Sequence, residues 1–188
     1  MQIAKETKSE TKFVSIGKWV AENLLLFDLG YYDFCLFYSI HMYGGYWISR
    51  LKSITNPIIE KDNIGNVSKF VGKRLSDIFE YHHNDVVDLM IMVTLRKRKR
   101  NGKQSGIMKK MPTKMMIRVV GVWNEEKQKY YTYITNVDVD TLNAKEVASA
   151  YSSRWVVETL FSELKNNFGM SGFRQSKNRP FSSLSMRR

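Results

Sequence analysis

Near its start the chain alternates between helical and strand-like apolar segments, and this alternation restricts the fold more than any other feature. Lys12–Glu22 has a helical pattern that places Phe13, Ile16, Trp19 and Val20 on one apolar side. The short apolar run NLLLFD that follows it, ending at Asp28, is typical of a buried strand. Phe34–Tyr43 is apolar almost all round, which predicts a buried helix that ends at Gly44. Tyr46–Lys52 alternates and predicts another strand. The order indicates an α/β fold, in which an acid at the end of a buried strand commonly takes part in ligand chemistry.

The stretch 53–141 differs, because strand-like runs dominate it. The runs Met115–Trp123 and Lys129–Val137 flank NEEKQ, which predicts a β-hairpin. A third strand-like run, LMIMVTL, precedes the basic segment RKRKRNGKQSG at 96–106, and Arg74–Glu80 has the pattern of a short helix. The sequence thus predicts three parts: an α/β unit at 1–52, a β-rich insertion at 53–141 that interrupts it, and a long helix with a short tail at 142–188.

The charge of the chain indicates a polyanionic partner. The 188 residues carry a formal net charge of +12, and Leu89–Asn124 contains ten Lys or Arg and no acid. Such a basic excess is typical of nucleic-acid binding, and we expect the 96–106 segment to contact a DNA backbone. The single cysteine, Cys35, and the lack of an apolar run of about 18 residues predict a soluble cytoplasmic protein with no membrane segment.

The helix at the start of the third part has its own start and stop signals. Asn143 can cap it, and Glu146 stands three residues on, as a capping box requires. Gly169 is expected to end it.

Four polar side chains share one face of this helix, namely Tyr151, Arg154, Glu158 and Lys165. At 100° per residue they fall within about 60° of arc, beside the apolar face, so we expect them along the rim of the core. An ordinary exposed i,i+4 pair would account for Arg154 and Glu158. It would not account for the other two residues.

The spacing Tyr-x2-Arg-x3-Glu-x6-Lys resembles, without a gap, the signature of DDE transposases of the insertion-sequence-four family. Its surroundings, ITN before the helix and LFSELK around the lysine, are similar too. FDLGYYDF followed by GGYWISRLK resembles the second-aspartate region of that family, where D-x-G-Y precedes a strand ending R-x-K. These stretches and the β-rich stretch between them cover most of the chain.

The resemblance implies a partial ribonuclease-H-like catalytic core with a β-rich insertion before the acidic helix. It also implies a site in which three carboxylates hold two Mg²⁺ (or Mn²⁺) ions, as hydrolysis and transfer of phosphodiesters require. Carried over, Asp28 is the second catalytic and metal-binding carboxylate, and Glu158 is the third. We therefore expect Asp28 and Glu158 to face each other despite the 129 residues between them.

The same resemblance implies contacts to DNA, at transposon ends and in target DNA. Phosphate contacts of this kind position the enzyme on the duplex. The residues expected to make them are Tyr151, Arg154 and Lys165 on the helix, and Arg50 and Lys52 at the end of a strand.

The chain departs from the family pattern before Asp28, which is its first aspartate; only Glu6, Glu10 and Glu22 precede it. The family requires a first aspartate on the first strand of the fold. We therefore expect an N-terminally truncated, inactive DNA transposase. The alternative is a non-catalytic DNA-binding or regulatory remnant that occupies ends, or that pairs with itself or with a full-length transposase. An RNA-binding module is disfavoured, because no RNA-recognition motif is visible.

Overall fold

The computed structural model describes residues 16–52, 55–63, 70–81, 86–95 and 111–156, together with 159 and 163. The boundary between two compact units falls after Tyr151. In chain order the elements are η2 (Lys18–Val20), β1 (Leu24–Phe27), η3 (Leu29–Tyr31), α1 (Phe34–Met42), β2 (Tyr46–Arg50), β3 (Ile59–Asp62), α2 (Leu75–Tyr81), β4 (Val86–Thr94), β5 (Lys114–Asn124), β6 (Lys129–Thr135) and α4 (Ala144–Ser152).

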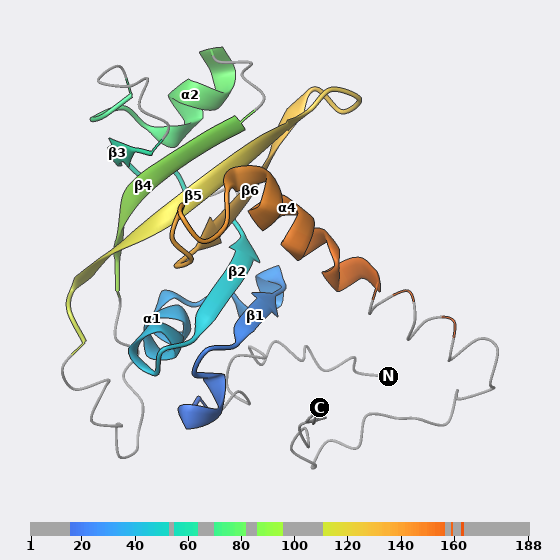
Figure 1. Cartoon of the computed structure of the whole chain (residues 1–188). Helices are drawn as coiled ribbons and strands as arrows, with labels where there is room; N and C mark the ends of the chain where they lie inside the picture. Colours follow the sequence, from blue (N-terminus) through green and yellow to red (C-terminus); the bar gives the residue numbers. More distant parts are fainter. Residues whose placement is uncertain are drawn as a thin grey trace, which may run out of the picture. The chain divides into compact units, whose positions relative to one another are not determined.

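The strands form one mixed sheet of six in the order β1-β2-β6-β5-β4-β3 (Figure 1). β1 and β2 are parallel, and every other pairing is antiparallel. The junction is the pairing of β2 with β6, in which Ile48 stands opposite Thr135. The strands of 53–141 therefore continue the sheet that β1 and β2 begin, so the chain has the mixed α/β architecture expected.

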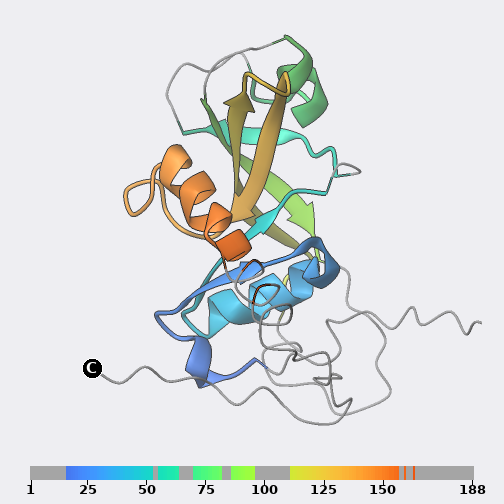
Figure 2. The same ribbon diagram turned by 90° about the vertical axis from the view of Figure 1, so that its right-hand side faces the viewer.

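Helices cover the two faces of this sheet unequally. One face packs against α1 and α2 in a large apolar cluster that includes Phe37, Ile78 and Ile134. The other face packs against α4 in a smaller cluster that includes Tyr133 and Val147. In Figure 2, α2 (green) and α4 (orange) lie on opposite sides of the strands. Below, these surfaces are called the α1 face and the α4 face.

The β1–α1–β2 unit forms because its local signals agree. The Asp33 carboxylate caps α1 by accepting a hydrogen bond from the Cys35 amide at 2.9 Å. Within the α1 face, Phe37 stacks on Trp47 of β2 with ring centroids 4.2 Å apart. The turn into β2 needs Gly45, because a Cβ there would lie 2.6 Å from the Val20 carbonyl oxygen.

Several expectations from the sequence are confirmed. β1, α1 and β2 lie where the apolar runs predict them, and α2 matches the helix expected at Arg74–Glu80. The predicted hairpin is the antiparallel pair β5–β6, in which Trp123 stands opposite Tyr130. At the start of α4 the capping box is complete: the Glu146 amide donates to Asn143 and the Asn143 amide donates to Glu146.

The helix expected over Lys12–Glu22 is wrong for the part that the structure describes. From residue 16 to Glu22 there is only the single turn η2, and Glu22 leaves it with a φ of 61°. Val20 is fully buried as expected, but Trp19, expected on the same apolar side, is 57% exposed. The tighter 3-10 turn changes which side chains share a face, so the 3.6-residue period misplaces Trp19.

Some predictions lie outside the described residues, among them the basic segment 96–106, the end of the long helix at Gly169, and the placement of Glu158 and Lys165. No helix among the described residues is long and apolar enough to span a membrane.

Candidate active site at the ends of β1 and β2

Asp28 directly follows β1, at the C-terminal end of the only parallel strand pair among the described residues. Leu26 belongs to the cluster of the α4 face and Phe27 to that of the α1 face. The backbone of Asp28 is still extended, with φ −74° and ψ 163°, so strand alternation directs its side chain to the α4 face. Asp28 is exposed, and its carboxylate does not cap the turn η3 that follows.

Arg50 ends the neighbouring strand at the same level. The register pairs Phe27 with Ser49, so the next positions, Asp28 and Arg50, stand side by side at the strand ends. Arg50 is half-buried and lies opposite Tyr133 of β6. An acidic and a basic residue thus occupy neighbouring positions at the edge where open α/β sheets bind their ligands.

Cations gather around one tyrosine beyond this edge. Arg50 and Lys127 each lie 5.9 Å from the centroid of the Tyr131 ring, and Lys129 lies 5.5 Å from it. Lys52 is 5.0 Å from the ring centroid of Tyr32. Such cation–π contacts fix the charged groups loosely, so they remain free to meet an anion.

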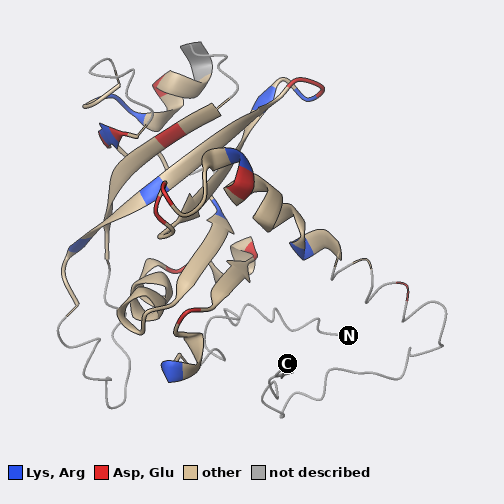
Figure 3. Cartoon of the chain, in the orientation of Figure 1, with Lys and Arg blue, Asp and Glu red and all other residues tan. Residues whose placement is uncertain are grey.

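The turn between β5 and β6 also contains Glu125 and Glu126, so charges of both signs lie there (Figure 3).

Tyr151 lies on α4 and is 2% exposed, so it belongs to the core and does not line its rim as expected. Its hydroxyl donates a hydrogen bond to the carbonyl of Phe27 at 3.3 Å. Its ring packs on Tyr133 with centroids 5.2 Å apart. Tyr151 therefore joins α4 to the last residue of β1, immediately before Asp28.

The tyrosines beside the site are partly desolvated. Burial raises the pKa of Tyr133, and the nearby Arg50 guanidinium opposes that rise. Burial also raises the pKa of Tyr32, against a hydrogen bond with Thr55 that lowers it. Both hydroxyls thus stay protonated at neutral pH and can donate or accept hydrogen bonds.

Arg154 belongs to the second compact unit. It is half-buried, and its guanidinium lies 5.4 Å from the ring centroid of Trp155, which is 59% exposed. Of the residues predicted from the sequence, the first unit brings together Asp28, Arg50 and Tyr151, with Lys52 two residues beyond Arg50.

The donor chemistry of this edge suits a hard divalent cation in part. Mg²⁺ prefers carboxylate and other oxygen ligands and keeps several waters, and an exposed carboxylate such as Asp28 meets that preference as one ligand. Within the described ranges no three His, Cys, Asp or Glu residues gather as a metal-binding group. Glu158, the other carboxylate expected at the site, is outside those ranges.

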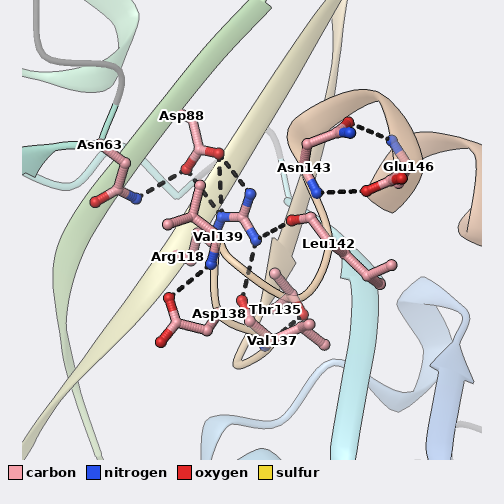
Figure 4. Close-up of polar contacts among 10 residues, drawn as sticks. All are labelled: Asn63, Asp88, Arg118, Thr135, Val137, Asp138, Val139, Leu142, Asn143 and Glu146. Carbon is pink, nitrogen blue, oxygen red and sulfur yellow. Dashed lines mark hydrogen bonds and ion pairs between the residues drawn. The ribbon is translucent and has the colours of Figure 1, made fainter.

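The α4 face contains a buried ion pair that the sequence did not predict. Asp88 of β4 and Arg118 of β5 are 1% and 3% exposed, and the guanidinium donates to both carboxylate oxygens (Figure 4). A signal was available: each charge interrupts an otherwise apolar strand, VVDLMIMVT and MMIRVVGVW. Buried charges are normally paired, so each one predicts a partner, although not which one.

Comparison with known families gives a match. The model of a family described as transposase DDE domain matches residues 4–182. No curated protein matches the chain.

Proposed function

The chain belongs to the transposase DDE domain family, whose model matches nearly its whole length, and we propose that it is a DNA transposase core of the insertion-sequence-four type. The finer assignment rests on Tyr151, Arg154, Glu158 and Lys165, which have the spacing of that family's signature. The proposed core is a partial ribonuclease-H-like fold with strands inserted before the acidic helix, acting in the cytoplasm on transposon ends and target DNA.

The observation that carries the proposal is the arrangement at the ends of β1 and β2. An exposed carboxylate, Asp28, stands beside a half-buried cation, Arg50, at the C-terminal edge of a parallel pair. Metal-assisted reaction at a phosphodiester uses both: carboxylates bind the metal ions, and cationic side chains bind the DNA backbone. We propose that Asp28 and Glu158 are the catalytic carboxylates, with Mg²⁺ or Mn²⁺ as the metal.

When bound, two such ions would activate the attacking oxygen and stabilise the leaving one. The chain's own residues would orient the DNA. We propose that Arg50 and Lys52 contact backbone phosphates from the strand end, and that Arg154 and Lys165 do so from the helix. Lys127 and Lys129, which lie near the Tyr131 ring together with Arg50, would extend this basic surface. Tyr151 supports this surface from within, since its hydroxyl is bonded to Phe27.

We further propose that these 188 residues alone bind DNA without cutting it. No aspartate precedes Asp28, so the sequence lacks a first carboxylate of the family type. Losing one essential member of a concerted site typically costs orders of magnitude in rate. A non-catalytic regulatory role, in which the chain occupies ends or pairs with itself or with a full-length transposase, would share this behaviour.

The test is to incubate the purified chain with Mg²⁺ or Mn²⁺ and labelled DNA carrying the ends of its element. We expect binding that weakens steeply with salt, and no strand cleavage. Lys165→Ala should reduce the salt slope by about one, as one lost phosphate contact does. Lys61→Ala, an exposed lysine on the far edge strand β3, is the matched control.

Two results would count against these proposals. Cleavage that Glu158→Ala abolishes would contradict the inactivity and require another carboxylate to complete the site. A salt slope that Lys165→Ala and Lys61→Ala leave equally unchanged would remove Lys165 from the DNA surface.

A further inference from the structure

The buried ion pair of Asp88 and Arg118 also forms hydrogen bonds with groups outside the pair. The Arg118 Nε donates to both carboxylate oxygens, at 2.9 and 3.1 Å, and Nη2 donates to one of them. Asn63, just after β3, donates to the same carboxylate at 2.8 Å. The Asp88 carboxylate therefore accepts hydrogen bonds from Arg118 on β5 and from Asn63 after β3. These bonds fix its position in the sheet.

The remaining guanidinium nitrogen reaches out of the sheet. Arg118 Nη1 donates to the carbonyl of Val137 at 3.1 Å and to that of Leu142 at 2.8 Å (Figure 4). These carbonyls lie in the segment 136–143, which connects β6 to α4. One side chain thus ties the centre of the sheet to both ends of the connection that leads into the helix.

Other contacts hold the same connection where it leaves the sheet. The Thr135 hydroxyl donates to the carbonyl of Trp47 and accepts from the Val137 amide. The Asn136 side chain accepts from the Trp47 amide and donates to the Gly45 carbonyl. With the Arg118 contacts, these bonds hold the connection between β6 and α4 against the sheet.

We propose that Arg118 is a positioning residue: it sets the start of α4 on the sheet, and so brings Tyr151 onto Phe27 beside Asp28. An α-helix is stiff over two turns, so a shift at Leu142 carries through to Tyr151 nine residues later. The inference that this positioning serves DNA chemistry rests on the proposed function. The contact geometry itself does not.

The choice of an ion pair supports this role. Well-packed apolar residues often replace a buried ion pair with no loss of stability, so stability alone does not explain Asp88 and Arg118. An apolar pair could not satisfy the Val137 and Leu142 carbonyls. Arginine can, because its planar guanidinium carries five donors in a fixed fork, whereas lysine offers one ammonium.

The experiment compares the intact chain with Asp88→Leu/Arg118→Met, which removes both charges, and with Arg118→Lys, which keeps the charge. We expect the urea midpoint of the double variant to fall only modestly, because replacing both charges of a buried pair is often close to neutral and a released connection lets water reach the Val137 and Leu142 carbonyls. Amide hydrogen exchange at Val147, whose amide donates to Asn143 in the first turn of α4, should nevertheless speed up about tenfold relative to the amides of β5. Arg118→Lys should give a smaller change in the same direction.

Unchanged exchange at Val147 in both variants would overturn the proposal. An equal rise in the exchange rates of Val147 and of the β5 amides would also overturn it, because the whole fold would then have loosened and not α4 alone. If the double variant does not fold, Arg118→Lys tests the proposal through the same comparison of exchange at Val147 with exchange in β5.

A DNA-binding measurement then tests the functional link. Binding of a labelled duplex carrying the ends of the element should weaken about tenfold in a double variant whose urea midpoint falls only modestly, as a displaced site would require, and Lys61→Ala should bind as the original does. An affinity that does not fall when α4 is released would overturn the link to DNA. If the original chain binds no DNA, the proposed function fails, while the exchange data still decide the role of Arg118.

Discussion

The two faces of the sheet differ in chemistry more than in extent. The α1 face is apolar throughout its buried cluster, with α1 and α2 packed on it. The α4 face carries a buried ion pair, a tyrosine bonded to a backbone carbonyl, and the Asp28–Arg50 edge. The first face can tolerate small shifts of its helices, because apolar contacts have no direction. The second cannot, because each hydrogen bond fixes a particular distance and angle.

This difference indicates how the chain separates folding from function. Burial of the α1 face supplies the main driving force for folding. The α4 face uses polar contacts that contribute less net stability, but they fix one arrangement of α4 over β1 and β2. The predictions below test that division.

The largest effect is expected on the α1 face. Trp47→Ala would remove a fully buried ring that stacks on Phe37, and it should lower the free energy of unfolding by about 3–5 kcal/mol. Urea denaturation followed by far-UV circular dichroism measures the change. Trp19→Ala, at a ring 57% exposed, is the control and should stay within about 0.5 kcal/mol. Equal losses of stability in the two variants would contradict the claim that burial on the α1 face drives folding.

Local signals in the sequence predict most of the elements that form the two faces. Apolar runs bounded by glycines locate β1, α1 and β2, and the Asn143 and Glu146 pair locates the start of α4. Each of these depends on residues within a few positions of one another, where hydrophobic period and capping chemistry decide the outcome. Asp28 at the end of a strand could be predicted for the same reason.

The polar contacts of the α4 face could not be predicted in this way, because they join distant residues. Nothing near Arg118 in the sequence names Asp88, 30 positions away, as its partner. Tyr151 was grouped with polar neighbours by helical period, yet its ring packs on Tyr133 and its hydroxyl reaches Phe27, 124 positions away. A tyrosine can be buried once its hydroxyl has a partner, and period alone does not reveal that partner.

On the α4 face, Arg50→Ala should affect DNA more than folding. We expect the salt slope of DNA binding to fall by about one and the affinity to fall up to about tenfold, because one phosphate contact is lost. Titration of a labelled duplex at several salt concentrations measures both. Lys61→Ala on β3 is the control. If Arg50→Ala changes only the urea midpoint, Arg50 belongs to the fold and not to the DNA surface.

Tyr151→Phe keeps the ring in the cluster and removes the hydroxyl that donates to Phe27. The loss of one buried hydrogen bond should cost about 1 kcal/mol, measured by urea denaturation. Tyr46→Phe, at an exposed position of β2, is the control. An unchanged stability would mean that the ring, and not the bond to β1, holds α4 in place.

The smallest effect concerns pH and Tyr133, which packs beneath Tyr151. Burial raises the pKa of Tyr133 above its ordinary value of 10.0, because the charged phenolate is disfavoured in the cluster. A group whose pKa is raised on folding stabilises the fold fully below its unfolded pKa, and that contribution is lost as pH rises through the folded pKa. The urea midpoint should therefore decline from about pH 10 upward, and Tyr133→Phe should decline less steeply. Lysines also lose their charge in this range, so the difference between the two curves isolates Tyr133. Parallel curves would mean that burial in the α4 face does not disfavour the Tyr133 phenolate.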